Sequence, residues 1–546
     1  MNIKLSLICL LVVLNAPHSG YAQSANVSLE FSSGDNDVIA HYRLSSATKM
    51  LRFNGNGKIR LVSWKAPEEA QLSNDGQTLE FSEPTTEFSV RLKPFERDGM
   101  LDRVYSPVIL FADRRSAHVY SEYLLPKDGG TVSFSNEGVT LGKQFSKYQI
   151  AWRSGDLPTY LLTGRATTEL KHEYAITKDA QLPVWIGRAL EQRLTALIQF
   201  YAKQFTNTPK DKPWILVSYD PNVASGIQYF RGDTNPGMVR LNFVGTGWNT
   251  ENPVSLQKLT QFLAHELFHL WNAGVWKNRA HDAIWLFEGG ADAAAQDALH
   301  RLGYLDDSEY KNMKTSHLLN CSLADGDSFT AKLNGRTFYT CGATIFHLAA
   351  AMSSQREKPI TPVELWKKIF LLSGTEGYAP TNLFQAIEQL QADSRQSSVS
   401  ALALKTLTEG TLDWKAGLET HQDAFHLYQP TVTNPPTLLA GIFLDKLLLE
   451  RIKDDCQGDI SVSYDQQIYH IDTLKTCRRI QKSITLTHLG GYSMRNSPEK
   501  AWAYARDKCL KTEDLEFSNE SGANLVLTCP QIPTLPQNLF VFKNED

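Results

Sequence analysis

The sequence predicts a multidomain α+β protein with an N-terminal β-domain, a central α+β domain followed by a helical domain, and a small C-terminal α+β domain. Three observations support this prediction. The chain has 546 residues, too many for one ordinary domain. The spacing of its apolar residues changes from two to about 3.6 near Pro183. Four of its seven cysteines lie beyond residue 450.

The composition is that of a globular protein with ample core. Hydrophobic residues make up 42% of the chain and charged residues 21%. The formal net charge is −4, and no long run of one sign interrupts the sequence. This balance argues against a nucleic-acid partner and against attachment to an anionic membrane.

The first 22 residues have the pattern of an export signal. Lys4 precedes an apolar run over Leu5–Leu14, and the small residues of Gly20-Tyr21-Ala22 follow it. This order is typical of a secretory signal peptide. The run is about half of the ~20 residues that a membrane-spanning helix needs. We therefore expect residues 1–22 to be removed and the protein to be exported, to the periplasm or the outside medium.

Six cysteines remain once Cys9 of the signal peptide is set aside, an even number in an oxidising compartment. They form three sequence-local pairs of similar spacing, and we expect three disulfides: Cys321–Cys341, Cys456–Cys477 and Cys509–Cys529. The sequence alone leaves the other fourteen pairings open.

Residues 23–155 have the pattern of a β-domain. Apolar and polar residues alternate in Val27–Phe31, Leu79–Phe81 and Phe88–Leu92, which places one face of each strand in a core. Turn-forming clusters separate these segments. The domain shows no residues with evident chemistry.

Residues 156–305 mix helices with strands. Apolar residues recur at helical spacing after Pro183, which suits a first helical position. Trp214–Tyr219 is predicted to be a buried strand, and Met238–Val244 a strand with alternating faces. Ser255 is the expected N-cap of the helix that follows.

The rest of the chain divides at a proline-rich stretch. Residues 306–430 are predicted to be mainly helical, as in Pro362–Phe370. Residues 428–436 form the expected linker. Residues 431–546 then hold four cysteines, so we expect a small disulfide-braced α+β domain there.

The chemistry is indicated by His265-Glu266-Leu267-Phe268-His269. On a helix, positions i and i+4 lie on one face about one turn apart, so both imidazoles can reach one metal ion. The glutamate between them can hold a metal-bound water instead of the metal. An ordinary amphipathic helix with one buried and one surface histidine is the competing interpretation of these five residues.

A third ligand favours the metal interpretation. Catalytic zinc takes three protein ligands and keeps one position open. Glu288 lies nineteen residues after His269, at the start of a helix expected to run from near Trp285 past Ala298. Its neighbours are apolar, so an unpaired carboxylate there would be costly without a cation. Asp292, one turn further on, can accept the outer ring N–H of a ligating histidine.

This spacing of H-E-x-x-H and glutamate resembles the gluzincin peptidases, which share a thermolysin-like catalytic fold. The segments His269-Leu270-Trp271-Asn272 and Trp285–Gly289 look like the glycyl aminopeptidase family, a relative of the aminopeptidase N family. The resemblance covers residues 185–360 by motif and implies a thermolysin-like domain at 156–305. Members often end in a PDZ domain. A degenerate PDZ-like domain at 431–546 is therefore one interpretation, although four cysteines and no clear carboxylate-binding loop oppose it.

The resemblance also implies a role for Tyr339. Related enzymes have a tyrosine in a Tyr-x-x-Gly helix start, and Phe338-Tyr339-Thr340-Cys341-Gly342 fits that pattern. Tyr339 is therefore the candidate oxyanion stabiliser. A disulfide at Cys341 would help to fix it.

One segment departs from the family. Related aminopeptidases use a glutamate on an edge strand before the zinc helix to bind the substrate's α-amino group, and the corresponding stretch 232–240 has none. We expect its one acid, Asp233, to lie in a turn. Substrate backbone could still pair with the strand Met238–Phe243. The weak candidates for substrate binding are Gly237, Met238, Val239 and Arg240.

The motif and the resemblance together imply one zinc ion per chain and hydrolysis of peptide bonds, by an aminopeptidase-like or an endopeptidase activity. A second hypothesis is a catalytically silent protein of the same fold that binds peptides or proteins. A third, a structural zinc site, is disfavoured because such sites usually have four protein ligands and no fourth is evident.

Overall fold

The computed structural model divides the chain into two compact units: residues up to Leu110 with Arg114–Arg165, and Phe111–Asp113 with Ala166–Asp546. The predicted signal peptide lies outside the described residues. These residues are 23–32, 37–94, 105–127, 129–135, 150–152, 160–164, 166–205, 207–210, 212–222, 228–235, 237–280, 282–333, 337–352, 360–391, 397–430, 435–456, 460–465, 468–473, 477–480, 484–519, 522, 524–529 and 539–543.

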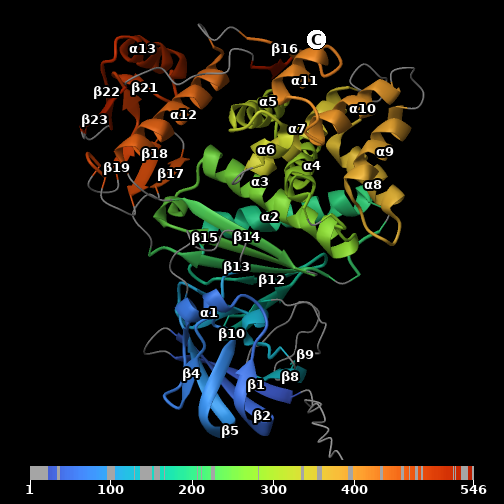
Figure 1. Cartoon of the computed structure of the whole chain (residues 1–546), viewed down its shortest axis with the longest axis vertical. Coiled ribbons are helices and arrows are strands. Elements are labelled where there is room, and N and C mark those ends of the chain that lie inside the picture. Colours follow the sequence, from blue (N-terminus) through green and yellow to red (C-terminus); the bar gives the residue numbers. More distant parts are fainter. Residues whose placement is uncertain are drawn as a thin grey trace, which may run out of the picture. The chain divides into compact units, whose positions relative to one another are not determined.

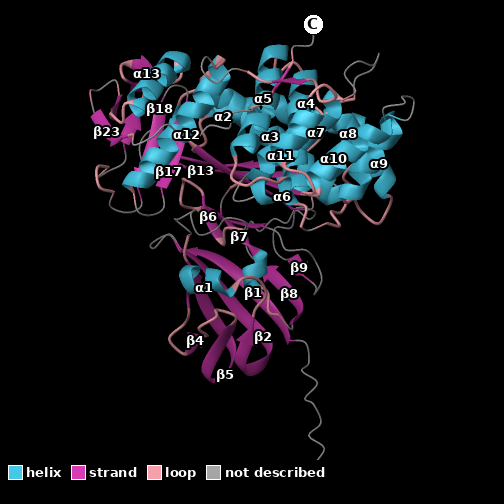
Figure 2. Cartoon of the chain, turned by 45° about the horizontal axis from the view of Figure 1, so that its top comes forward, coloured by secondary structure: helices cyan, strands magenta, loops and turns pink. Residues whose placement is uncertain are grey.

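The first unit is built mainly of strands (Figure 2). Its larger sheet has the order β3-β5-β2-β1-β8-β9, with β4 paired to β5, and its smaller sheet the order β10-β7-β6. One face of the long strands is buried, because apolar residues alternate with polar ones. The elements are β1 (Gln23–Ser32), β2 (Asp37–Arg52), α1 (Gly57–Ser63), β3 (Trp64–Lys65), β4 (Ala70–Leu72), β5 (Thr78–Leu92), β6 (Val108–Leu110), β7 (Ser116–Tyr120), η2 (Ser121–Leu124), β8 (Gly129–Ser135), β9 (Ile150–Trp152) and β10 (Tyr160–Gly164).

The second unit begins with a five-stranded sheet of order β11-β12-β13-β15-β14. The strands β12, β13 and β15 run parallel, whereas β14 pairs antiparallel with β15. Helix α2 connects β12 to β13, and α3 follows β15 through a short helical turn. The elements are β11 (Thr168–Leu170), β12 (Ala175–Lys178), α2 (Val184–Gln204), β13 (Trp214–Asp220), β14 (Tyr229–Asn235), β15 (Met238–Val244), η3 (Thr246–Asn249) and α3 (Pro253–His269).

The predicted pairing of substrate with Met238–Phe243 is wrong. Strand β15 lies between β13 and β14, so its backbone is paired on both sides. Among the described strands, β14 and β11 are the two edges of the sheet. Asp233 lies in this strand and not in a turn, and it forms an ion pair with the buried Arg240.

Helices α2 and α3 cover one face of this sheet (Figure 1). Every second residue of β13 and β15, such as Val217 and Leu241, joins Leu190 of α2 and Leu263 of α3 in one core. The predicted N-cap Ser255 is wrong by one turn. The cap is Asn252, whose side-chain oxygen accepts from the backbone N–H of Ser255 at 2.8 Å.

The described residues between 306 and 430 are mainly helical, and Figure 2 shows these helices gathered together. Two π-helical turns precede it and lie next to the metal-binding motif. The elements are η4 (Leu270–Val275), η5 (Trp285–Gly289), α4 (Gly290–Arg301), α5 (Asp307–Leu323), α6 (Phe329–Lys332), α7 (Thr337–Ala351), α8 (Pro362–Ser373), α9 (Pro380–Gln391), α10 (Ser397–Thr408) and α11 (Trp414–Thr420).

The C-terminal part combines two helices with two small sheets, β17-β18-β19 and β21-β20-β22-β23. The chain then returns, because β24 pairs with β16 at the end of the helical region. The elements are β16 (Leu427–Tyr428), α12 (Thr437–Asp455), β17 (Ile460–Asp465), β18 (Ile468–Thr473), β19 (Ile484–Leu486), β20 (His488–Leu489), β21 (Tyr492–Ser493), α13 (Pro498–Leu510), β22 (Asp514–Ser518), β23 (Asn524–Thr528) and β24 (Val541–Phe542).

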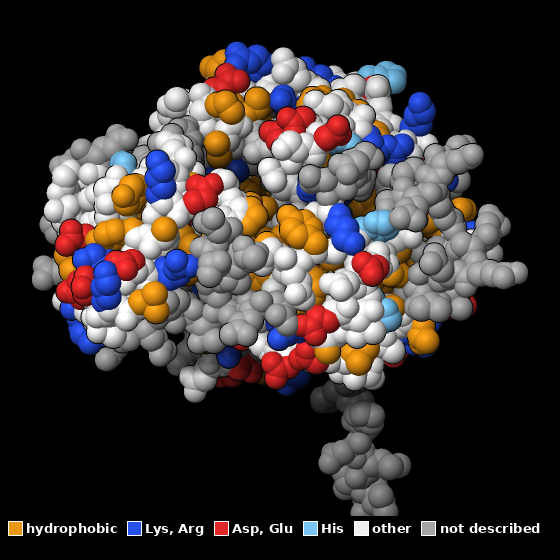
Figure 3. All heavy atoms as spheres, turned by 90° about the horizontal axis from the view of Figure 1, so that it is seen from above, with side chains coloured by type: hydrophobic (Ala, Val, Ile, Leu, Met, Phe, Trp, Pro, Cys, Tyr) orange, Lys and Arg blue, Asp and Glu red, His pale blue; other side chains and the backbone are white. Residues whose placement is uncertain are grey.

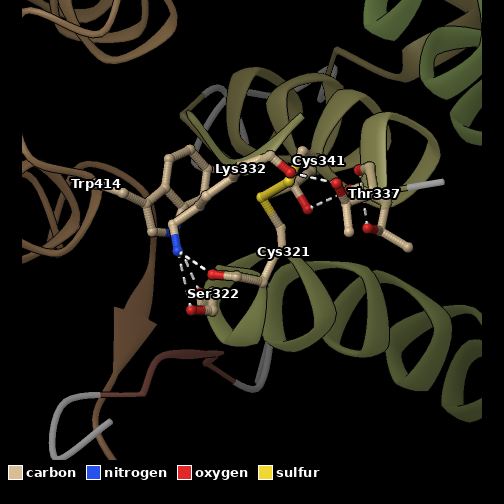
Figure 4. The surroundings of a disulfide bond; sticks show 9 residues. Cys321, Ser322, Lys332, Thr337, Cys341 and Trp414 are labelled. Atoms are coloured by element: carbon tan, nitrogen blue, oxygen red, sulfur yellow. Dashed lines mark hydrogen bonds between the residues drawn. A yellow bond between two sulfur atoms is a disulfide. The ribbon is translucent and has the colours of Figure 1, made fainter. Parts of the chain in front are cut away.

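The three expected disulfides are confirmed: Cys321–Cys341, Cys456–Cys477 and Cys509–Cys529. The first joins α5 to α7 (Figure 4). Beside it, the buried Lys332 donates to the backbone oxygens of Ser322 and Ala324 at 3.2 and 2.7 Å, which closes the end of α5.

No helix in the described part of the chain has the length and apolar character needed to cross a bilayer. On the face shown in Figure 3, basic and acidic side chains are interspersed.

Candidate metal centre

Helix α3 presents two buried histidines to one point. His265 and His269 are one turn apart near its C-terminal end, and their exposed fractions are 9% and 4%. Their Nε2 atoms lie 3.0 Å apart. The helical spacing expected from the sequence therefore brings both nitrogens together.

Glu288 completes the group from the π-helical turn η5. Its Oε2 lies 3.2 Å from Nε2 of His265 and 3.3 Å from Nε2 of His269. Ligand atoms about 2.0–2.1 Å from a tetrahedral zinc ion are roughly 3.3–3.4 Å apart. The three atoms thus form a triangle of the size that zinc requires, and they can hold a metal ion.

Each imidazole has an oxygen acceptor at its other nitrogen. Nδ1 of His265 lies 2.7 Å from Oδ1 of Asp292, the residue expected in this position. Nδ1 of His269 lies 2.8 Å from Oδ1 of Asn272. The Asn272 amide nitrogen donates to the backbone oxygen of Phe287 at 3.0 Å, which fixes its oxygen toward the histidine.

These acceptors decide which nitrogens are free for a cation. A carboxylate and an amide oxygen can only accept, so both histidines carry their hydrogen on Nδ1. When both imidazoles are neutral, two bare Nε2 atoms and one carboxylate oxygen converge on one point. A divalent cation satisfies that arrangement, and the two-nitrogen, one-oxygen set suits zinc.

When no cation is bound, the neighbouring charges shift the pKa values of His265 and Glu288 in opposite directions. Burial lowers the pKa of His265, but Asp292 and Glu288 outweigh it and raise that pKa well above its ordinary value. Burial would raise the pKa of Glu288, but the two histidines hold it well below its usual range. Protons and a metal ion therefore compete for the same site.

Glu266 is close to the group but is not part of it. It is 8% exposed, and burial raises its pKa, an effect that His265 and His269 partly offset. The Thr234 hydroxyl of β14 donates toward its Oε2 at 3.0 Å. Gly232 of the same strand lies against the Glu266 carboxylate, because a Cβ there would overlap this carboxylate in its present position.

Tyr339 stands in the first turn of α7, as predicted, with its ring centroid 5.9 Å from that of His265. A close backbone approach places it there. The Cα atoms of Gly289 and Gly342 face each other so closely that a Cβ on Gly342 would overlap the backbone oxygen of Trp285. Two glycines thus allow α7 to lie against the turn that carries Glu288.

The structure separates the other predicted residues from this group. Met238, Val239 and Arg240 are fully buried within the sheet, and Arg240 faces Asp233. Gly237 lies in the turn that precedes them, with a positive φ of 77°.

Two residues at the site, Thr234 and Asn272, were not found from the sequence. Asn272 follows His269 by three positions, which in a helix is a spacing that allows contact, and this was the available signal. Thr234 had none, because its strand is rich in turn-forming residues.

No protein-family model matches the chain, and no curated protein does. Solved structures of M1 zinc metallopeptidases are similar at low identity. The enzyme from Deinococcus radiodurans has a TM-score of 0.43 and 12% identity over 72% of this chain and 94% of its own. Yeast leukotriene A4 hydrolase has a TM-score of 0.42 and 11% identity, over 78% of this chain and 71% of its own. Legionella pneumophila aminopeptidase A, in complex with aspartic acid, has a TM-score of 0.41 and 13% identity, over 71% of this chain and 49% of its own. The likeness is distant, so the function is argued from the site.

Proposed function

We propose that this protein is a zinc-dependent peptidase with a single zinc ion held by His265, His269 and Glu288. The observation that supports the proposal is the triangle of ligand atoms, 3.0 to 3.3 Å on a side, with a buried glutamate beside it. Three protein ligands leave a fourth position open, as catalytic zinc requires. A structural site would use that position for a fourth side chain.

The bound metal would supply a Lewis acid that polarises the scissile carbonyl and lowers the pKa of water. Glu266 then takes a proton from the attacking water and returns it to the leaving amine. Its burial suits this role, because a raised pKa brings a carboxylate nearer to the pH at which it must exchange protons.

Tyr339 is the proposed stabiliser of the oxyanion. Its ring lies beside His265 at the start of α7, on the same side of the site as the turn that carries Glu288. Its hydroxyl would donate to the developing negative charge, and removal of one oxyanion donor typically costs about 2.7–4 kcal/mol.

The proposed substrate is a peptide or protein in an extended conformation. Among the described strands, β14 ends the sheet on the side of Glu266, and a peptide can add to an edge strand as a further strand. Both aminopeptidase-like and endopeptidase activity fit this arrangement. We also propose that the protein is exported, which three disulfides support, since such bonds persist in oxidising compartments.

The test is hydrolysis of a mixed peptide library by the purified mature chain beside Glu266→Gln, with zinc quantified in both. We expect zinc in both proteins and cleavage only by the wild type, because glutamine keeps the shape of the side chain but cannot take the proton. His269→Ala should lose both zinc and turnover. The cleavage positions separate aminopeptidase from endopeptidase.

Substantial hydrolysis by Glu266→Gln would show that the role of this residue is wrongly assigned. Zinc in both proteins with cleavage in neither would instead favour a silent peptide-binding protein. The sequence of β14 supports this second candidate, because the strand has no glutamate for a substrate's amino group. Its one acid, Asp233, is turned to Arg240 and away from Glu266.

A further inference from the structure

Thr234 reaches the proposed catalytic glutamate from the edge strand. Its Oγ1 lies 3.0 Å from Oε2 of Glu266 and 3.0 Å from the backbone oxygen of the same residue. A hydroxyl has one hydrogen, and both of these oxygens accept, so that hydrogen is shared between them. One side chain of β14 thus contacts both the main chain and the carboxylate of Glu266.

The register of the sheet explains why Thr234 makes this contact and the neighbouring acid does not. Thr234 pairs with Val239, which belongs to the core that α2 and α3 share with the sheet. Directly paired residues point to the same face, so Thr234 faces α3. Asp233 pairs with Arg240 on the opposite face.

Gly232 contacts the Glu266 carboxylate on the side away from Thr234. It lies two positions before Thr234 and therefore on the same face of the strand. A Cβ at this position would overlap Oε1 of Glu266, so one carboxylate oxygen rests over the glycine while the other meets the threonine hydroxyl. The carboxylate is bounded by β14 at both oxygens.

We propose that Thr234 is a positioning residue for the hydrolysis: its hydroxyl fixes the direction of the Glu266 carboxylate at the metal centre. The inference rests on the proposed function. A glutamate side chain has several rotatable bonds, and the hydroxyl limits the directions that the carboxylate can take. A displacement of about 1 Å in a reacting group can reduce turnover by ~100-fold.

The competing explanation is purely structural. In that case the hydroxyl matters only because its bond to the Glu266 backbone oxygen joins β14 to α3. Loss of the hydroxyl would then lower thermal stability or zinc content, and turnover by the protein that remains folded and loaded with zinc would be unchanged.

The experiment compares Thr234→Val, which keeps the shape and removes the hydroxyl, with Thr234→Ser, which keeps the hydroxyl. Thr168→Val is the matched control, since Thr168 lies on β11 at the opposite edge of the same sheet and its hydroxyl bonds Thr177 at 2.8 Å. The measurements are kcat and KM on a peptide that the wild type cleaves, zinc content and the thermal midpoint. Thr234→Ala replaces the valine variant if that one does not fold.

We expect Thr234→Val to lower kcat about 10- to 100-fold with KM and zinc content unchanged. Thr234→Ser should recover most of the rate, and Thr168→Val should keep it. An unchanged kcat in Thr234→Val, or a loss explained by zinc content, would overturn the inference and leave the peptidase intact. Absence of hydrolysis by the zinc-loaded wild type would overturn the proposed function and this role together.

Discussion

The orientation of each histidine depends on one residue that accepts from its outer nitrogen. Asp292 and Asn272 accept from the Nδ1 hydrogens of His265 and His269, so the neutral imidazoles present bare Nε2 atoms to a metal ion. Asn272 is also tied to the turn before Glu288 through the oxygen of Phe287. It therefore connects the second histidine to the segment that carries the third ligand.

We expect Asn272→Ala to weaken zinc binding by about 10- to 100-fold, because His269 would lose the acceptor that fixes its tautomer and ring direction. Competition with a chelator of known affinity measures the change. Asn242→Ala is the control: this asparagine lies on β15 and accepts from Ser218. Equal affinity in wild type and Asn272→Ala would show that the backbone alone orients His269.

The protonation of His265 makes the zinc affinity depend on pH. In the cation-free protein the pKa of His265 is raised well above its ordinary value, because Asp292 and Glu288 outweigh the effect of burial. Zinc must displace that proton, so apparent affinity should fall as the pH is lowered from about 8 to 6. Calorimetry in buffers of different ionisation enthalpy would report the released proton. Affinity that does not change over this range would contradict the expectation.

At the scale of elements, the site depends on the close approach of α7 to η5. Gly342 allows it, since a Cβ there would overlap the backbone oxygen of Trp285. We expect Gly342→Ala to lower the free energy of unfolding by about 1–3 kcal/mol, the usual range for overpacking. It should also reduce kcat, because α7 carries Tyr339. Thermal unfolding and peptide hydrolysis measure the two effects.

Gly187 of α2 is the matched control. A Cβ there would meet no atom within 4 Å. Gly187→Ala should therefore stabilise the protein by about 0.5–1 kcal/mol, since alanine loses less backbone entropy in a helix than glycine. If both variants behaved alike, the contact between α7 and η5 would not constrain the structure.

The sequence predicted those helices and strands in which apolar residues recur at one regular spacing. The buried strand Trp214–Tyr219 and the helix of His265 follow from apolar spacing. Strand β14 was missed because Gly232, Asp233 and Asn235 are residues typical of turns. Its formation depends on pairing with β15, a long-range contact that local propensity does not contain.

Asn272 was missed for a related reason. The contact from His269 requires the chain to stay helical beyond the motif, and it does so through the π-helical turn Leu270–Val275. Such turns are rare and have no clear sequence pattern. The three metal ligands could be predicted from the spacing of the motif alone. The residues that contact them could be identified only from the three-dimensional structure.

At the scale of the whole molecule, the disulfides divide between the site and the C-terminal part. Cys321–Cys341 joins α5 to α7, two residues beyond Tyr339, within the core that includes α3. Cys509–Cys529 belongs to a second core with α12 and α13. Their sequence separations are equal, 20 residues each, so the entropic gain from closing each loop is similar.

These two disulfides give a matched pair of double variants. Replacing either pair with serine should cost about 3 kcal/mol by the loop-closure argument. We expect only Cys321→Ser/Cys341→Ser to lower kcat, because α7 carries Tyr339 and lies against the turn of Glu288. Cys509→Ser/Cys529→Ser should keep both zinc and kcat, because its helix and strands pack in the other core.

Thermal unfolding, zinc content and kcat, measured on both double variants under the same conditions, decide between these expectations. Loss of zinc in Cys509→Ser/Cys529→Ser would show that the C-terminal core supports the metal centre directly. An unchanged kcat in Cys321→Ser/Cys341→Ser would show that the glycine contact of α7 with η5 is enough to hold Tyr339. In that case the disulfide would contribute stability alone.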